Sequence, residues 1–438
     1  MSSVRNRDLA KDARALRPNA QRVAWLVAEK ALLLASSFFV GIWIVRALGP
    51  TDYGRFSIAL SITAVLASVA AAGLDTVLLR RFTSDPGSAR PTLVAALAVR
   101  LAGALTHLAL CWVAALLFFS EDPEVALATL IVASAALLRV ADVVGLRLQA
   151  EDRYPLAASI RVMARMGGDG LRVALIMADA SILWFAAAIV AEAVLSACLF
   201  ALVERGVQTR RFTLDRTLAR RLVLEGWPIA VSGVLAGLYA RLDQAVVYAT
   251  LGAQANGHYA AAVRVSELFN LLVMSVAAVA APHFARLSGA GDEEFEARLR
   301  TYFRLMVALG VGIALTVSLF AEPIMRLLYG AAFLPAAHIL SIHAWTIPLV
   351  FASVAMEPWF YHYGKVSLYV PKTVIALLCA VPLVLGGAQW LGSAGVAAAV
   401  VCVYAISVIG SNALLPDARR ALRFQVSAAL GGAWGGAR

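Results

Sequence analysis

Charged residues are scarce in this sequence: of its 438 residues, 15% are Asp, Glu, Lys or Arg, whereas 61% are hydrophobic. So few charges cannot cover the surface of a soluble domain. Cysteine is scarce too, and Cys111, Cys198, Cys379 and Cys402 lie far apart within apolar runs. That spacing argues against a disulfide framework and against a zinc site. The composition therefore predicts an all-α polytopic membrane protein.

Catalytic and phosphate-binding motifs are missing as well. The sequence has no glycine-rich phosphate loop, no Walker-type lysine, no nucleophile elbow and no paired acidic motif on a long loop. Its histidines do not have the spacing of metal ligands. The longest connection predicted on the outer side, residues 321–334, is too short to fold into a catalytic platform. We therefore expect no enzymatic activity, no metal site and no cofactor.

Long apolar runs dominate what is present. A hydrocarbon layer of roughly 30 Å needs a helix of about 20 residues. Twelve runs are long enough to be spans: 23–46, 55–78, 91–119, 123–146, 154–178, 181–204, 223–250, 257–285, 299–321, 335–361, 367–388 and 394–416. Six precede an arginine-rich stretch and six follow it. The predicted parts are a basic tail 1–22, an N-lobe 23–204, a basic linker 205–222, a C-lobe 223–416 and a tail 417–438.

The Lys and Arg residues are distributed unevenly between the loops. Every second loop, counted from the N-terminus, is rich in them, whereas the intervening loops contain only Arg46, Arg55 and Arg326. Lys and Arg near span ends concentrate on the cytoplasmic side. Both termini and the linker are therefore predicted to be cytoplasmic, and the net charge of +11 reflects topology. Nucleic-acid binding is disfavoured, because no folded basic domain surrounds these residues.

One predicted span carries an unusual charged stripe. Arg161, Arg165, Asp169 and Arg172 recur at i, i+4, i+8 and i+11, so they share one helix face about 16 Å long. A charge near the bilayer centre costs roughly 3 kcal/mol or more, so it normally faces a partner or a water-filled cavity. Two interpretations stay open. Asp169 pairs with the arginines as structural support, or the stripe is a cationic wall for an anionic substrate, since guanidinium groups match phosphate oxygens.

Other charged or polar residues within spans are further candidates. The additional substrate-binding candidates are Arg100, Arg241 and Arg264. Carboxylates at membrane depth can carry a coupling ion, because burial favours their protonated form. The candidates for this role are Glu192, Asp243, Glu357 and Asp169. Cavity-lining candidates are Glu29, Lys30, Asp75 and Tyr239. Simple ion pairing explains several of them equally well: Asp75 could pair with Arg80, and Arg264 is spaced to pair with Glu267.

Two short segments share a pattern, one in each half. After Leu48-Gly49 come four residues, then Gly54, one further residue and an aromatic residue, and the same pattern of Leu251-Gly252 and Gly257 returns 203 positions further on. Each segment follows the first predicted span of its half. Because glycine permits tight turns, we predict that these glycines form the re-entry between the first two helices of each lobe. A role as a gate is the alternative.

These segments carry a family resemblance, together with residues 73–81, 243–259 and 282–286. The chain resembles the polysaccharide-transport family of lipid-linked oligosaccharide flippases, the Wzx-type O-antigen translocases, within the multidrug/oligosaccharidyl-lipid/polysaccharide exporter superfamily. The resemblance implies two pseudo-twofold-related six-helix lobes around a central cavity, in a bacterial cytoplasmic membrane. It implies alternating-access translocation of an undecaprenyl-diphosphate-linked glycan from the cytoplasmic to the periplasmic leaflet.

The resemblance also implies partners, namely the lipid-linked glycan, the bilayer, and a glycan polymerase and glycosyltransferases. Coupling to H⁺ or Na⁺ is an open expectation. A cation-coupled multidrug extruder is the main alternative, and it would rely on acidic and aromatic cavity residues. A membrane enzyme of glycan assembly is opposed by the short outer loops. A non-transporting scaffold for glycan enzymes would tolerate neutral replacement of the arginines in the charged stripe.

Overall fold

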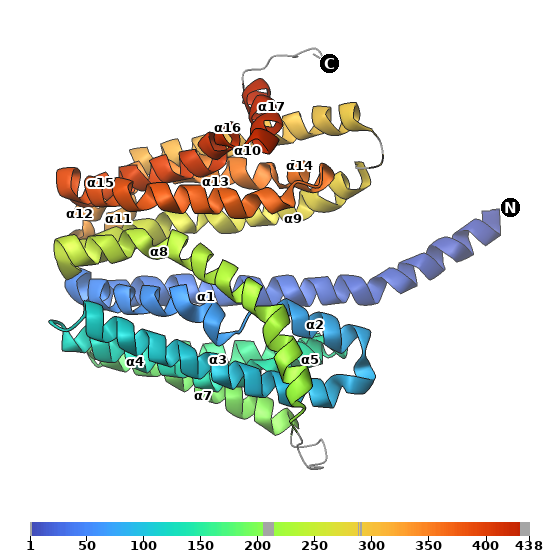
Figure 1. Cartoon of the computed structure of the whole chain (residues 1–438), viewed down its shortest axis with the longest axis horizontal. Coiled ribbons are helices and arrows are strands. Elements are labelled where there is room, and N and C mark those ends of the chain that lie inside the picture. The colour runs from blue at the N-terminus through green and yellow to red at the C-terminus, as the bar shows by residue number, and fades with distance from the viewer. Residues whose placement is uncertain (1, 205–213, 288, 290, 430–438) are drawn as a thin grey trace. The chain divides into compact units, whose positions relative to one another are not determined.

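The computed structural model describes residues 2–204, 214–287, 289 and 291–429, and it describes side chains there except those of residues 2–31, 34 and 35. Every regular element in this part of the chain is a helix, as Figure 1 shows. The all-α prediction is therefore confirmed for the described residues. Glu29 and Lys30, two candidate cavity residues, lie outside the described side chains.

Long apolar helices correspond to the predicted spans. Eight ranges within the described residues are long and apolar enough to cross a membrane. Three of these, Ser36–Ser84, Arg216–Leu287 and Val366–Leu414, each pass through at least one bend and contain two predicted spans. The one predicted span outside the eight ranges is α6 (Tyr154–Met177). Its charged stripe explains this, because charges lower the mean hydropathy of a helix.

The chain forms two compact units. The N-unit contains the chain up to Ala47 together with Ile62–Val234, and the C-unit contains Leu48–Ser61 together with the chain from Leu235 onward. Two helices contribute to both units, because each is much longer than a single span. These are α1 (Ser2–Ala70) and α8 (Arg216–Glu267).

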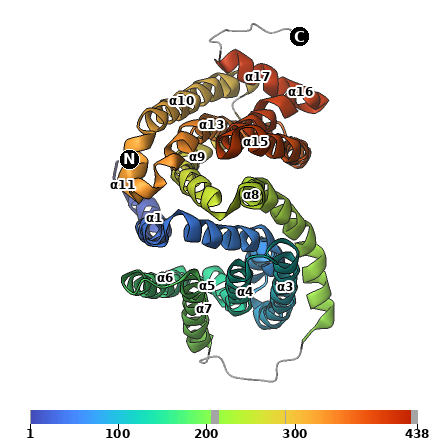
Figure 2. The same cartoon turned by 90° about the vertical axis from the view of Figure 1, so that its left-hand side faces the viewer.

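The N-unit is completed by helices that run between short turns. They are α2 (Asp75–Ser84), η1 (Pro86–Ser88), α3 (Ala89–Phe118), α4 (Pro123–Leu138), η2 (Arg139–Ala141), α5 (Asp142–Ala150), α6, and α7 (Ile182–Glu204). Local sequence sets some of their starts: the Asp122 side chain accepts a hydrogen bond from the Val125 amide, and Pro123 occupies the first turn of α4. Figure 2 shows α6 beside α7, and α7 packs in turn on α4.

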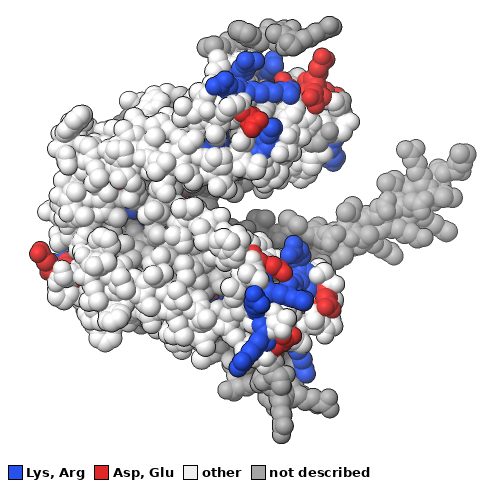
Figure 3. Space-filling view, in the orientation of Figure 1, with Lys and Arg blue, Asp and Glu red and all other residues white. Residues whose placement is uncertain are grey.

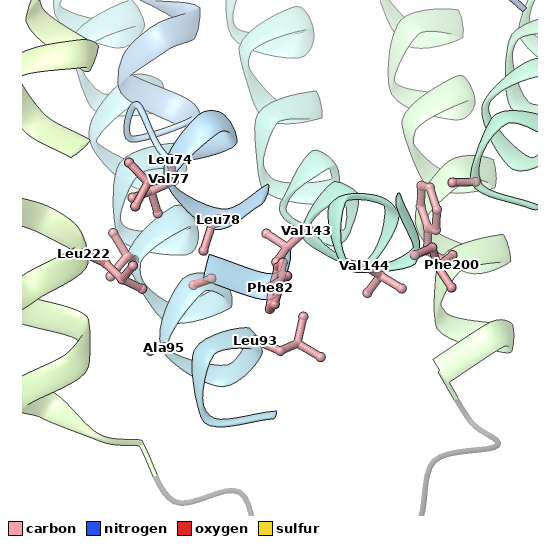
Figure 4. Packing of buried hydrophobic residues seen from close by; sticks show 14 of the residues in the cluster. Leu74, Val77, Leu78, Phe82, Leu93, Ala95, Val143, Val144, Phe200 and Leu222 are labelled. Carbon is pink, nitrogen blue, oxygen red and sulfur yellow. The ribbon is translucent and has the colours of Figure 1, made fainter. Parts of the chain in front are cut away.

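A cluster of apolar side chains holds one end of the N-unit together. Leu74, Leu78, Val143, Phe200 and Leu222 are all fully buried, and they come from four parts of the chain, namely α2 with the residue before it, α5, α7 and α8 (Figure 4). Burying such side chains stabilises a fold by about 2 kcal/mol each. The cluster therefore fixes where α5 and α7 stand relative to α2, and so positions the helix on which α6 packs.

The C-unit is built from the second part of α8 and the helices that follow. They are α9 (Phe269–Leu287), α10 (Asp292–Leu319), α11 (Ala321–Tyr329), η3 (Ala331–Phe333), α12 (Pro335–His343), α13 (Thr346–Ala355), α14 (Glu357–His362), η4 (Val366–Leu368), α15 (Tyr369–Ala405), η5 (Ile406–Gly410), α16 (Ser411–Leu414), η6 (Pro416–Ala418) and α17 (Arg419–Ala429). The long predicted span 335–361 is interrupted between α12, α13 and α14. Proline contributes to one of these breaks, since Pro358 occupies the first turn of α14.

Glycines bend the two long helices at equivalent places. Gly49 has φ 69° and ψ 177° within α1, and Gly252 has φ 85° and ψ 179° within α8. Only glycine adopts such a conformation without a steric cost. These are the glycines of the repeated segments, so the prediction that they form the re-entry between the first two helices is confirmed.

Charged side chains gather at one end of each unit. On the face shown in Figure 3, the blue and red atoms of each unit crowd together mainly at one end, and the surface between the ends is almost entirely white. A band without charge is what a hydrocarbon layer requires. The picture agrees with the uneven distribution of Lys and Arg between the loops.

Candidate functional site

The charged stripe of α6 meets a carboxylate from α7. Arg172 donates from Nη1 to Asp169 Oδ1 over 2.6 Å and from Nη2 to Glu192 Oε2 over 2.6 Å. Arg165 donates from Nε to Asp169 Oδ2 over 3.0 Å, and its Nη1 lies 3.7 Å from Glu192 Oε2. The hydroxyl of Ser36 on α1 also donates to Asp169. We call Arg165, Asp169, Arg172 and Glu192 the charged quartet.

Burial divides the charged quartet into an inner and an outer pair. The side chains of Asp169 and Arg172 are 6% and 8% exposed, whereas those of Glu192 and Arg165 are 17% and 24% exposed. Gly168 makes room for this arrangement, because a Cβ at that position would lie 2.9 Å from the Glu192 side chain. The outer pair is therefore the more accessible side of the quartet.

The opposite face of α6 is apolar and exposed. Met163, Met166 and Leu171 expose 57%, 38% and 39% of their surface. Large apolar side chains on the outside and charges on the inside are the arrangement expected of a helix that borders lipid on one face. This supports the assignment of α6 as a membrane span despite its charge.

Arg161 belongs to a different group of charges. Its guanidinium lies over the Tyr154 ring, 5.6 Å from the centroid, and it faces α5 near Gly145. Together with Arg100 and Arg139 it lies in electrostatic range of Asp142. The stripe predicted to act as one wall thus divides, since Arg165 and Arg172 face Glu192 while Arg161 faces α5.

Arg100 is buried and forms an ion pair with Asp75. The spacing had suggested Arg80 as the partner of Asp75. Instead, Arg80 and Arg81 both bind Glu225, with shortest N to O distances of 3.4 and 2.5 Å. The candidates Arg100 and Asp75 are therefore brought together within the N-unit.

A small cavity of about 40 Å³, lined by both polar and apolar side chains, lies inside the C-unit. Asp243 lines it and accepts hydrogen bonds from Tyr259 Oη over 2.6 Å and from the Gln244 amide over 2.8 Å. Tyr239 and Tyr404 line it as well, with ring centroids 5.6 Å apart. A cavity of this size suits a few water molecules or a small cation and is too small for a sugar.

Of the remaining candidates of the C-unit, Arg241 adjoins the same cavity, since it lies in electrostatic range of Asp243 and its partner Glu267 lines the cavity. Arg241 Nη1 pairs with Glu267 Oε1 over 3.3 Å, and Arg264, which the spacing had matched with Glu267, lies in electrostatic range of the same carboxylate. Arg264 hydrogen-bonds to the side chain of Tyr53. Glu357 begins α14 and lies in electrostatic range of Tyr302 and Tyr369.

Several polar residues around these sites escaped the sequence analysis. Tyr259 and Gln244 bind the Asp243 carboxylate, and His343 Nδ1 lies 3.0 Å from Ser266 Oγ at the edge of the same cavity. Tyr259 is 16 positions from Asp243 and His343 is 77 positions from Ser266, so helical spacing does not reveal these pairs. Within the described part of the chain, no group of three or more His, Cys, Asp or Glu side chains is arranged to hold a metal ion.

The fold is similar to that of solved membrane transporters. Lipid II flippase MurJ in an inward closed conformation matches with a TM-score of 0.72 and 14% identity, over 94% of this chain and 90% of that chain. An inward-facing multidrug resistance MATE family transporter of the MOP superfamily matches with a TM-score of 0.64 and 15% identity, over 90% of this chain and 96% of that chain. A MOP superfamily transporter from Pyrococcus furiosus matches with a TM-score of 0.61 and 16% identity, over 92% of this chain and 95% of that chain.

These likenesses define the class: a polytopic membrane protein with the two-lobed fold of the MOP superfamily, as predicted. The family is narrower. Residues 43–338 match the model of a family described as polysaccharide biosynthesis protein, and the chain belongs to that family. No curated protein matches the chain in sequence.

Proposed function

We propose that the protein is a flippase for cell-surface polysaccharide biosynthesis. It moves an undecaprenyl-diphosphate-linked oligosaccharide repeat unit, such as an O-antigen unit, across the cytoplasmic membrane by alternating access. The family and the similarity to a lipid II flippase support this proposal. The observation that carries it is the presence of Arg165 and Arg172 inside a membrane-spanning helix, with Arg165 partly exposed.

The chemistry of the cargo explains why arginines are needed at that depth. A diphosphate brings negative charge into a region of low dielectric, where an unpaired charge is costly. Arginine presents a planar fork of donors that matches phosphate oxygens and remains charged. Arg165 is the first contact in this proposal, because it is the more exposed arginine of the quartet. Arg161 and Arg100 supply further positive charge from α6 and α3.

The direction and driving force are part of the same proposal. Both termini face the cytoplasm, where the lipid-linked unit is made, and the glycan polymerase and glycosyltransferases are its partners. Transport is coupled to H⁺ or Na⁺, with Glu192, Asp169, Asp243 and Glu357 as the candidate ion sites. The cavity at Asp243 supports a role in coupling, because its size suits a small cation.

The proposal is tested by replacing the arginines of α6 in cells. Arg161→Ala and Arg165→Ala are expected to abolish surface glycan display while the amount of folded protein in the membrane stays the same, because the diphosphate loses its cations. Glycan display is measured by surface labelling, and protein by detergent extraction and gel filtration. Arg80→Ala is the matched control, since Arg80 is 72% exposed and its partner Glu225 keeps Arg81. Unchanged display in both α6 variants would contradict the proposal.

A multidrug extruder is the rival suggested by the similarity to MATE transporters. Acidic and aromatic side chains do meet in the C-unit, where Asp243, Tyr239 and Tyr404 line one cavity. At about 40 Å³, however, that cavity is far smaller than the several hundred Å³ typical of drug-binding pockets. Under this rival, loss of the protein would raise sensitivity to cationic drugs and leave surface glycans intact.

A further inference from the structure

The charged quartet is electrically balanced, since it contains two arginines and two carboxylates. Each arginine already has a carboxylate within ion-pair distance: Arg165 has Asp169 at 3.0 Å, and Arg172 has both Asp169 and Glu192 at 2.6 Å. An anionic substrate therefore meets guanidinium groups that are already paired with carboxylates of the protein. To bind them, it must take the place of a carboxylate that is part of the protein.

The two carboxylates are held unequally. Asp169 accepts hydrogen bonds from Arg165, Arg172 and Ser36, and its side chain is only 6% exposed. Glu192 accepts one hydrogen bond, from Arg172, while Arg165 lies 3.7 Å away. Glu192 also belongs to the outer, more exposed pair, and its long side chain can swing away without moving the helix. Glu192 is thus the carboxylate that can be exchanged, and Asp169 is the fixed one.

We propose that Glu192 is an internal counter-ion which the anionic group of the substrate displaces from Arg172 and Arg165, and that Glu192 takes up one proton when it is displaced. This inference rests on the proposed function, because it names how the same site couples its substrate to an ion. The proton comes from water that reaches the outer pair, and it binds a carboxylate oxygen of Glu192. No covalent bond in the substrate changes, and release of the anion returns the proton.

Electrostatics provides the reason for the proton. While Glu192 pairs with Arg172, its negative charge is compensated. Once an anion occupies the guanidinium groups, the carboxylate loses its cation and gains a negative neighbour in a poorly solvated place. Both changes favour its neutral form. Anion binding and proton binding at the charged quartet therefore assist each other.

Other titratable groups lie on the elements that pack against α7. Those elements are α4, η2, α5 and α6, and outside the quartet their titratable or charged residues are Glu124, Arg139, Asp142, Arg147, Tyr154 and Arg161. Arg147 pairs with Glu204 over 2.8 Å and with Glu151 over 3.1 Å. Among the described residues, the ion-pair partners of Glu192 are Arg165 and Arg172.

Sulfate is a suitable probe, because it and a diphosphate diester both stay fully ionised near neutral pH and bring no titrating proton of their own. Sulfate binding to the purified full-length protein is measured by calorimetry in buffers of different ionisation enthalpy, at constant ionic strength set with chloride. The wild type is expected to take up about one proton per sulfate, and its affinity is expected to rise about tenfold per unit decrease in pH.

Glu192→Gln is the decisive variant. The amide keeps the shape of the side chain and still accepts from Arg172, but it holds the guanidinium without a negative charge. Sulfate is expected to bind this variant about tenfold or more tightly at pH 7.5 than it binds the wild type, with no proton uptake. Glu204→Gln is the matched control, because Glu204 also lies on α7 and pairs with an arginine but stands outside the quartet. It should behave as the wild type does, and thermal unfolding of each variant verifies the fold.

The outcomes separate the two proposals. Sulfate binding without proton uptake in the wild type, equal affinity in Glu192→Gln, or no sulfate binding in either protein each overturns the counter-ion inference. Surface glycan display that survives removal of Arg161 and Arg165 overturns the proposed function alone, even where proton-linked sulfate binding is observed.

Discussion

Arg172 and Arg80 make similar ion pairs in very different surroundings. The Arg172 side chain is 8% exposed and contacts two carboxylates, whereas the Arg80 side chain is 72% exposed. Water can replace the partner of an exposed arginine, so an exposed pair contributes about 0–1 kcal/mol. Removing one member of a buried pair leaves charges without compensation. At the scale of single residues, burial thus decides which arginines matter for stability.

Arg172→Ala is therefore expected to destabilise the protein by about 3 kcal/mol or more, because it leaves Asp169 and Glu192 with fewer cations. Arg80→Ala should lower stability by less than about 1 kcal/mol. Thermal unfolding of the two purified variants beside the wild type measures the difference. Equal melting temperatures for Arg172→Ala and Arg80→Ala would show that the quartet does not support the fold.

The repeated segments acquire a second role at the scale of whole helices, within the C-unit. Gly54 and Gly257 approach the opposite repeat reciprocally: a Cβ on Gly54 would lie 1.8 Å from the Ala253 carbonyl oxygen, and one on Gly257 would lie 1.7 Å from that of Pro50. Asn256 Nδ2 donates to the Gly54 carbonyl oxygen over 2.8 Å. The bends at Gly49 and Gly252 shape each segment, and these other two glycines let the segments touch.

Gly54→Ala and Gly257→Ala are each expected to destabilise the protein by about 2 kcal/mol, because the added methyl group meets backbone, which cannot move aside cheaply. Gly312→Ala is the control: Gly312 lies within α10, and a Cβ there has open space around it. That change should be neutral or slightly stabilising, since alanine favours helix. Unfolding temperatures compare the three variants, and a loss in Gly312→Ala as large as in the others would refute the close-packing argument.

The distribution of charge matters at the scale of the whole molecule. The exposed Glu322 and Arg326 lie on α11, in a connection predicted to face the periplasm, whereas the exposed Asp85 lies between α2 and α3, in one predicted to face the cytoplasm. Each position lies outside the predicted spans. Orientation of the chain in the membrane follows from such loops, because Lys and Arg near span ends are retained in the cytoplasm.

Cysteine labelling tests this orientation. In a background in which the four native cysteines are replaced by serine, Glu322→Cys should react with a membrane-impermeant thiol reagent applied outside intact cells. Asp85→Cys should react only after the membrane is opened. The reverse pattern would invert the topology, and labelling of both from outside would show that the spans were miscounted.

Much of the fold could be predicted, because membrane spans are marked by local composition. The run 181–204 corresponds to α7, and the glycines at 49 and 252 stand at the bends. The breaks after His343 and Ala355 were not predictable in position, since short turns inside a long apolar run leave little trace in composition. Residues 48–61 lie in the predicted N-lobe but belong to the C-unit, and residues 223–234 lie in the predicted C-lobe but belong to the N-unit. No sequence pattern indicates this, because it depends on contacts between distant helices.

The sequence predicts which residues belong to the candidate site better than it predicts which of them form ion pairs with each other. Helical periodicity alone placed Arg165, Asp169 and Arg172 on one face, because 3.6 residues per turn is a property of every α-helix. Periodicity says nothing about which neighbouring helix meets that face. Glu192 reaches the arginines only because α7 packs on α6, where Gly168 leaves room for the Glu192 side chain. With Glu192 included, the positive charges of the stripe are balanced by two carboxylates.

By itself, the sequence determined that this is a polytopic all-α protein and that α6 carries charge where lipid does not tolerate it, and it predicts which side of the membrane the loops face. These properties are local, since they depend on composition and on the geometry of one helix. The tertiary structure alone decided that Arg165 and Arg172 already have partners, that Arg161 lies against Tyr154 and α5, and that Asp243 borders a small cavity. Partnership depends on how helices that are distant in the chain pack, and a one-dimensional pattern does not contain that information.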